Sequence, residues 1–287
     1  DSQMPAQLSQ ASQTNPPRTD FRPILRFCVA LLVAATTFGV AAFMVHGVVL
    51  KALAASARPA ATNAPRQSTG AAETPAGLAV IQKMHDRYAS TWYSTLSFTE
   101  IAEQRSDDGK TTSETWWEEA KLPGQLRIDL GAPPTDTSKP RRIVVYTPDG
   151  EYDKRPGQPV HHTDRRNFLL ILGFDVYRQP VDRTVEELKA EGFDLSKVRS
   201  DTWHGRNVTV VGGDKQFWID TERQLFVRLI DGDTEAWFDD YRPLDGGWIA
   251  AEVGIKNKGV MRLHEVYSNI KANVDLPDAM FDPGRLP

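Results

Sequence analysis

Histidines are the side chains of this sequence that could most readily hold a metal ion. His161 and His162 are adjacent and lie close to Asp164, but neighbouring residues on a strand point to opposite faces. We therefore expect a solvated loop at this place, since metal ligands must converge on one point. His85 has no second histidine or carboxylate at metal-ligand spacing, and we expect it at the edge of a core. The sequence predicts no metal site and no cofactor.

Two pairs of neighbouring acids, Glu118-Glu119 and Asp239-Asp240, are the candidates for general acid and base chemistry. Neighbours in a strand diverge, so the members of a pair cannot address one substrate atom. We expect these acids on solvent-facing strand positions and in turns. The sequence contains no G-x-S-x-G, H-E-x-x-H, C-x-x-C, P-loop or dinucleotide-binding motif. These patterns indicate a protein that has no catalytic residues and is not an enzyme.

The composition excludes nucleic acid as a partner and allows a sizeable core. The 287 residues include 34 Lys and Arg against 38 Asp and Glu, which gives a net charge of −4 and no basic run for phosphates. The single cysteine, Cys28, excludes a disulfide or a cysteine-based metal site within the chain. With 40% hydrophobic residues, the chain can fold around a hydrophobic core.

The first quarter of the sequence is predicted to determine location. Residues 1–22 are rich in Ser, Gln, Pro and Ala and are expected to be a disordered tail. Residues 23–51 contain an almost unbroken apolar run, residues 24–50, that exceeds the roughly 20 residues needed to cross a bilayer. Arginines precede this run, which favours a cytoplasmic N-terminus and an exported remainder. Residues 52–75, rich in Pro, Ala, Ser and Thr, are expected to be a flexible linker.

The apolar run allows two outcomes for the exported part. Its length favours an uncleaved transmembrane anchor, while the small residues at positions 52–57 also suit a signal peptidase. In either case we expect residues 76–287 to form one periplasmic domain. That domain is tethered to the inner membrane by residues 24–50 or is released by cleavage of a signal peptide.

Two helices of this domain are predicted from their apolar residues. From Leu78 to Trp92 these residues recur at spacings of three and four, which is typical of an amphipathic helix of about four turns. A second helix, capped by Asp164, is expected to run through residues 168–174. This segment is apolar on every side, and we expect it to be a buried lid.

A third helix is predicted after the lid. Thr184 and Glu187 form a capping-box pair that would open it, and Gly192 would end it. Helices inserted in a series of strands must pack on the dry face of the sheet.

The rest of the domain is predicted to be strands that alternate with turns. Asp107-Asp108-Gly109 is a strong hairpin signal, and Leu126 and Ile128 share one face of their strand. This pattern indicates a meandering antiparallel sheet or barrel. The eleven expected strands span residues 95–105, 111–122, 125–130, 141–146, 151–154, 207–211, 216–220, 225–230, 234–241, 248–256 and 260–272.

Short motifs follow one another along residues 76–287 in an order that is known from one family. They are the segments 120–128, 149–150, 216–220, 224–227 and 279–283. In order and spacing they resemble the LolA/LolB-like periplasmic lipoprotein carriers, the outer-membrane lipoprotein-sorting family.

The resemblance implies a mainly β (α+β) fold, an incomplete antiparallel β-barrel of about eleven strands with helices packed on its concave face. It also implies that this face receives acyl chains, and the apolar lining after the family's proline corresponds to Leu126 and Ile128. The family's arginine after the second strand corresponds to Leu122, so we expect a mouth without a cation and without directional handover of the ligand.

The expected function is that of an exported lipid- or lipoprotein-binding protein, an envelope carrier or a lipid-presenting module. Its partners would be lipid or lipoprotein acyl chains, a membrane and an envelope protein. One alternative is a membrane-anchored sensor of envelope stress with a lipid-binding fold. Another is an esterase-like enzyme with a Ser or Asp beside His161, His162 or His204. The expected ligand-binding residues are Leu126, Ile128, Ile143, Val145, Phe168, Leu169, Leu172, Phe217 and Ile219.

Overall fold

The structure, a computed structural model, describes residues 75–287. The expected tail, the apolar run and the linker up to residue 74 lie outside the described residues, so tether and signal peptide both stay predictions. Within residues 75–287, no helix is both long and apolar enough to cross a membrane.

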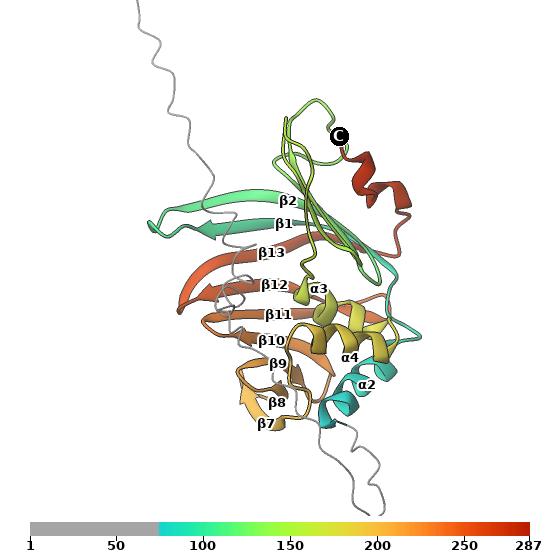
Figure 1. The fold of residues 1–287 in the computed structure, drawn as a ribbon, viewed down its shortest axis with the longest axis vertical. Helices are drawn as coiled ribbons and strands as arrows, with labels where there is room; N and C mark the ends of the chain where they lie inside the picture. Colours follow the sequence, from blue (N-terminus) through green and yellow to red (C-terminus); the bar gives the residue numbers. More distant parts are fainter. Residues whose placement is uncertain (1–74) are drawn as a thin grey trace, which may run out of the picture.

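A single antiparallel sheet of thirteen strands forms the body of the protein (Figure 1). Strands β1 to β6 and strands β7 to β13 each follow one another in chain order, and the pairing of β1 with β13 joins the two series. The strands are β1 Thr95–Arg105, β2 Thr111–Lys121, β3 Gln125–Leu130, β4 Arg142–Thr147, β5 Gly150–Lys154, β6 His161–Thr163, β7 Val198–Trp203, β8 Arg206–Gly212, β9 Lys215–Asp220, β10 Leu225–Asp231, β11 Thr234–Leu244, β12 Gly247–Asn257 and β13 Val260–Ala272.

Eleven of these strands match the predicted ones, and β6 and β7 were not predicted. These two are the edge strands of the sheet. β6 has three residues, and most residues of β7 are exposed, so neither shows the alternation that marks a strand with one buried face. The segment with His161 and His162 is therefore strand β6 and not a loop.

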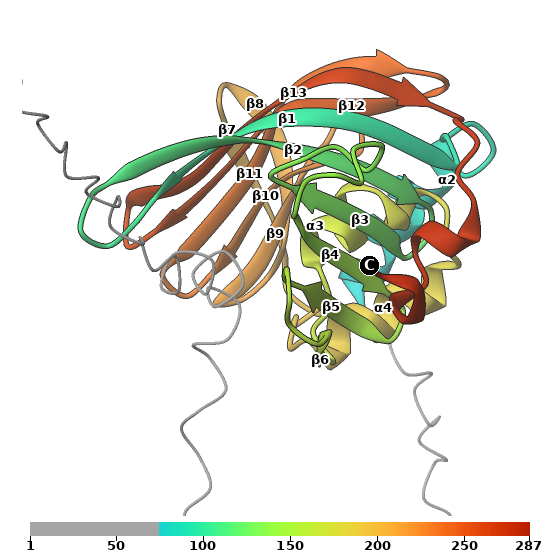
Figure 2. The ribbon, with the colours of Figure 1, turned by 90° about the horizontal axis from the view of Figure 1, so that it is seen from above.

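The sheet curves without closing, and the helices lie inside the curve (Figure 2). They are α2 Ala76–Tyr88, α3 Phe168–Gly173 and α4 Val181–Ala190. The predicted fold, an incomplete barrel with helices on its concave face, is confirmed. The helices in this position bury the apolar face of the strands that they cover.

The N-terminal ends of α3 and α4 differ from the predicted ones. Asn167, not Asp164, caps α3, because its Oδ1 accepts hydrogen bonds from the amides of Leu169 and Leu170. α4 begins at Val181, directly after a proline, so Thr184 lies inside the helix and does not open it. A proline fixes its own φ near the helical value and can precede or begin a helix without any side-chain cap.

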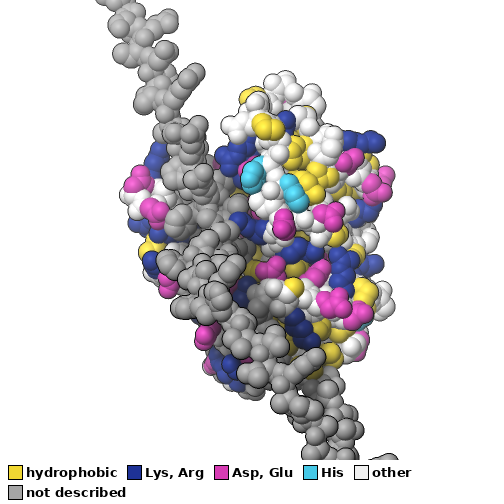
Figure 3. Space-filling model, viewed as in Figure 1, with side chains coloured by type: hydrophobic (Ala, Val, Ile, Leu, Met, Phe, Trp, Pro, Cys, Tyr) yellow, Lys and Arg dark blue, Asp and Glu magenta, His cyan; other side chains and the backbone are white. Residues whose placement is uncertain are grey.

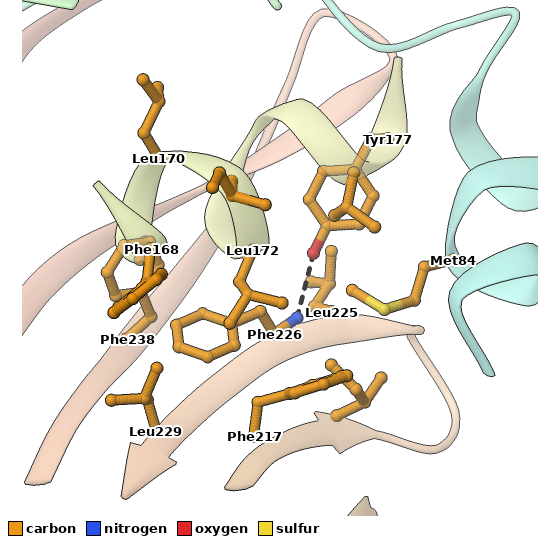
Figure 4. Close-up of a cluster of buried hydrophobic side chains, with 14 of the residues drawn as sticks. Met84, Phe168, Leu170, Leu172, Tyr177, Phe217, Leu225, Phe226, Leu229 and Phe238 are labelled. Atoms are coloured by element: carbon orange, nitrogen blue, oxygen red, sulfur yellow. Dashed lines mark hydrogen bonds between the residues drawn. The ribbon is translucent and has the colours of Figure 1, made fainter. Parts of the chain in front are cut away.

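The largest hydrophobic cluster lies between the helices and the concave face, with residues from strands β1 to β3 and β8 to β13. Figure 4 shows side chains of α2 and α3 converging on Phe217, Leu225 and Phe226 of strands β9 and β10. The Tyr177 hydroxyl accepts a hydrogen bond from the amide of Phe226 at 2.9 Å, which satisfies both groups inside the core. Fully burying one such large side chain contributes about 1.5–3 kcal/mol, so this cluster holds the helices on the sheet.

The C-terminal segment covers the convex face of β3 to β5, outside the curve (Figure 2). Phe281 is buried there against Ile143 and Val145 of β4. Beside this contact the Arg127 guanidinium pairs with the buried carboxylate of Asp129 at 2.6 Å and donates to the Met280 carbonyl at 2.9 Å. The segment is therefore fixed by both apolar and charged contacts.

Candidate functional site

Two adjoining cavities lie between the concave face of the sheet and the start of α3. The larger, about 130 Å³, opens over strands β2 to β4 and β12 to β13, and its walls are mostly apolar. Its lining residues are Trp116, Ile128, Leu130, Arg142, Val144, Tyr146, Glu151, Arg165, Arg166, Asn167, Leu169, Ile255, Leu263 and Glu265.

The smaller cavity, about 90 Å³, continues toward the core and is rich in aromatic side chains. Both cavities are lined by Trp116, Ile128, Asn167, Leu169 and Glu265, so they meet at these residues. We call the two cavities together the groove. The other residues that line the smaller cavity are Phe98, Glu118, Ala120, Leu126, Leu170, Phe174, Phe238 and Tyr267.

Strand register places the floor of the groove on one face of the sheet. Ile128 of β3 lies opposite Glu118 on one side and opposite Val144 on the other. Residues directly opposite each other in an antiparallel sheet point to the same side. Ile128, Val144 and the next inward residue, Leu130, therefore form one apolar strip under α3.

Three of the nine predicted ligand-binding residues line the groove: Leu126, Ile128 and Leu169. Leu169 is half-buried and lies over both cavities, as expected of a lid residue.

The other six residues lie elsewhere. Ile143 and Val145 point to the convex face and pack against Phe281, because they alternate along β4 with the inward Val144. The remaining four are buried inside the filled core and are at most 4% exposed: Phe168, Leu172, Phe217 and Ile219.

Acidic side chains were not expected on the concave face. Glu118 and Glu119 were expected in solvent, and both are buried. They diverge as predicted, with Glu118 toward the groove and Glu119 toward the other face. Burial raises the pKa of Glu119 to about 7, against the lowering effect of the Arg127 guanidinium. Alternation with Trp116 and Ala120 is the signal that could have placed Glu118 inward.

Four ionisable side chains lie side by side on the concave face of neighbouring strands: Glu118 of β2, Glu100 of β1, and Glu265 and Tyr267 of β13. The Glu118 carboxyl hydrogen-bonds with that of Glu100, and the Tyr267 hydroxyl donates to Glu265 at 3.4 Å. Burial raises the pKa of Glu118 well above its ordinary value, and the charge of Glu265 raises it further. Burial also raises the pKa of Glu265, so these carboxyls hold protons at pH values where exposed ones do not.

Three arginines line the larger cavity, although the resemblance led us to expect no cation at the mouth. Arg142 pairs with Asp153 at 2.7 Å, and Arg166 pairs with Glu187 at 2.6 Å. Arg165 lies 3.9 Å from Glu151. Leu122, from which the absence of a cation was inferred, is buried in the hydrophobic core and does not line the groove.

The histidines lie away from the groove. His204 is exposed, and its Nδ1 is 3.1 Å from Asp239 Oδ2, which is the histidine–aspartate contact that the esterase alternative predicts. His162 stacks on Tyr152 and lies 3.1 Å from the Asp149 carbonyl through Nε2. Among residues 75–287, no group of three His, Cys, Asp or Glu side chains could hold a metal ion.

Comparisons with known proteins show a likeness in fold to solved structures. No protein-family model matches the chain, and no curated protein matches it in sequence. A DUF1329 family protein from Desulfovibrio piger matches in structure, with 13% identity, a TM-score of 0.51 and coverage of 75% of this chain and 100% of that protein. This chain has the fold of that protein. At such low identity the likeness concerns the fold alone.

Two lipoprotein-sorting structures also match. A LolA superfamily protein from Nitrosomonas europaea shares 10% identity over 72% of this chain and 99% of its own, with a TM-score of 0.47. A domain from Vibrio parahaemolyticus assigned to outer-membrane lipoprotein sorting shares 13% identity over 72% of this chain and 97% of its own, with a TM-score of 0.49. The family that the motifs resemble is thus represented among the structures that this chain matches.

Proposed function

We propose that this protein binds the acyl chain of a lipid or lipoprotein in the groove, as an envelope carrier or lipid-presenting module in the periplasm. The observation that carries this proposal is the groove between the apolar strip and α3. Leu130, Val144 and Leu263 line its larger cavity. An acyl chain would fill that space and gain about 0.8 kcal/mol for each methylene that it buries.

The size of the groove limits what binds without a change in structure. A cavity of about 150 Å³ holds a ligand such as benzene, so the larger cavity, of about 130 Å³, holds only a segment of an acyl chain. A longer chain requires α3 to move outward. α3 is suited to such movement, because it has six residues and Leu169 is its main contact with both cavities.

The proposal makes this protein a binding protein and not an enzyme. The groove lacks a histidine among its lining residues, and its carboxyls stand beside aromatic and apolar groups. The export and the tether inferred from residues 24–50 agree with a role in the envelope.

Photolabelling in cells tests the proposal with the full chain. Bacteria that express the protein are grown with a diazirine-bearing fatty acid, irradiated, and the protein is digested for mass spectrometry. We expect labelled peptides from β2, β3 and the start of α3. Ile128→Trp should fill the groove and reduce the labelling several-fold.

A substitution on the opposite face of the sheet provides the matched control. Val266 is 47% exposed on β13, and its neighbour Glu265 faces the groove. Val266→Trp should therefore leave the labelling unchanged. Equal labelling of the Ile128→Trp and Val266→Trp proteins would show that the acyl chain does not bind in the groove.

A further inference from the structure

The junction of the two cavities has polar side chains, and apolar side chains lie on either side of it. Trp116, Asn167 and Glu265 line both cavities and so stand where they meet. Trp116 is only 5% exposed, and its Nε1 has no hydrogen-bond partner among residues 75–287. A buried N–H that is left unpaired costs free energy, which a ligand oxygen would recover.

Asn167 supplies a second donor at the same place. Its Oδ1 accepts hydrogen bonds from the amides of Leu169 and Leu170, at 3.0 and 3.1 Å. Backbone N–H groups can only donate, so this contact fixes which atom of the side chain is the oxygen. The Asn167 amide nitrogen is then turned away from the helix, and within the described part of the chain it donates to no residue.

Apolar side chains flank these donors in both directions. The larger cavity offers Leu130, Val144 and Leu263 on one side of the junction. The smaller cavity offers Phe98, Phe174 and Phe238 on the other. A ligand that fits this arrangement has one hydrogen-bond acceptor between two apolar arms.

We propose that the junction binds the carbonyl oxygen of an acyl ester or acyl amide, with the donors Trp116 Nε1 and Asn167 Nδ2 and one apolar arm of the ligand in each cavity. This inference rests on the proposed function and names its ligand class. It distinguishes an esterified or amide-linked acyl chain from a bare hydrocarbon.

The charges around the junction favour a neutral acceptor. A carboxylate would be buried beside Glu265 and Glu118, where burial already raises the pKa of both carboxyls and so disfavours an anion. An ammonium group would leave both N–H donors without an acceptor. A carbonyl oxygen satisfies both donors and adds no charge. The titratable and charged groups that face the groove from the surrounding elements are Glu100, Glu118, Arg142, Tyr146, Glu151, Arg165, Arg166, Glu265 and Tyr267.

Competition binding of two ligands that differ only in the carbonyl tests the inference. Palmitic acid methyl ester and hexadecyl methyl ether, delivered from phosphatidylcholine vesicles, displace a fluorescent acyl reporter from the full chain. We expect the ester to bind roughly tenfold more tightly, the effect of about one to two hydrogen bonds. Trp116→Phe keeps an aromatic ring and removes the N–H, and it should reduce the preference for the ester about fivefold.

The chain offers close controls for both donors. Trp218 is also buried with an unpaired Nε1, but it lies on the convex face, so Trp218→Phe should leave the preference unchanged. Asn167→Asp keeps the oxygen that caps α3 and replaces the donor by an acceptor, so it should abolish the preference.

The outcomes separate this inference from the proposed function. Equal affinity for ester and ether in the wild-type protein would overturn the carbonyl site and leave acyl binding intact. Failure of both ligands to bind would overturn the proposed function itself. Tighter binding of hexadecylamine than of the ester would show a cation site at Glu265 and would also overturn the inference.

Discussion

The two halves of the concave face show how one sheet serves two purposes. Over β8 to β11, α2, α3 and α4 bury their apolar stripes, and Phe217 and Phe226 are fully inaccessible to solvent. Over β2 to β4, α3 leaves the groove open, and Ile128 and Leu169 stay half-buried beside empty space. The first half holds the structure together, and the second leaves surface for a ligand.

Each half contains a tryptophan N–H without a hydrogen-bond partner among residues 75–287, but Trp116 lines the groove and Trp92 of the filled half does not. In the filled half, tyrosine hydroxyls pair with the backbone, as Tyr177 does with the Phe226 amide and Tyr93 with the Trp248 carbonyl. In the open half, Trp116 keeps an unpaired N–H within residues 75–287, and the pKa of buried Glu265 is raised. A region with both uncovered apolar surface and unpaired buried donors is suited to binding.

On the exposed surface, basic and acidic side chains are interspersed over the described residues that Figure 3 shows.

Two leucines of α3 provide the most severe test of this comparison. Leu172 is fully buried over the filled half, and Leu172→Ala should lower the free energy of unfolding by about 2–5 kcal/mol. Leu169 lies over the groove, and Leu169→Ala should cost less than about 1 kcal/mol, since its side chain already borders empty space. Urea denaturation of the full chain measures both. Equal losses would mean that the two halves are packed alike.

The pH dependence of stability tests the acids of the open half. Burial raises the pKa of Glu265 to about 8 from its ordinary 4.5, so the folded state holds a proton that the unfolded state loses first. The stability contributed by this proton is complete below pH 4.5 and is lost as the pH rises through about 8. The free energy of unfolding should fall in this window by up to about 1.4 kcal/mol for each pH unit.

Glu265→Gln should flatten this part of the pH curve, because the amide does not titrate. Glu103 lies exposed on β1, and Glu103→Gln should leave the curve as in the wild-type protein. An unchanged curve for Glu265→Gln would show that Glu265 is ionised in the folded protein at neutral pH.

The smallest effect concerns the cap of α3. Asn167→Ala removes the acceptor for the Leu169 and Leu170 amides and should cost about 1 kcal/mol, while Asn167→Asp keeps the cap and should cost little. Hydrogen exchange of these two amides should accelerate in the alanine variant alone. If exchange were unchanged, α3 would be held by packing and the lid would not depend on its cap.

The sequence predicted most of the sheet because alternation marks strands with one dry face. It missed β6 and β7, which lie at the edges and have little buried surface. It misplaced Ile143 and Val145 because β4 is buried on both faces. The apolar residues of this strand do not alternate with polar ones, so the sequence does not show which of them face the concave side. It placed Glu118 in solvent because a carboxylate is rarely buried, although alternation with Trp116 and Ala120 indicates the inward direction that the register of β2 shows.

Parts of the groove depend on tertiary contacts that no local pattern encodes. How α3 packs on the sheet determines two features. Asn167 and not Asp164 caps the helix, and the helix covers the concave face only in part. Leu126, Ile128 and Leu169 were predictable since two lie on an alternating strand and the third lies in an apolar segment. Which apolar residues fill the core and which border a cavity depends on the packing of the three helices.

The pairing of β1 with β13 has a consequence for the order in which the molecule is assembled. Every other strand pairs with its neighbour in the chain, so each series can form locally, whereas Leu96 and Ala272 must meet across nearly the whole domain. The groove straddles this seam, with Trp116 on one side and Leu263 and Glu265 on the other. Under the proposed function, ligand binding and closure of the seam would therefore be thermodynamically linked. A bound acyl chain would hold the beginning and the end of the domain together.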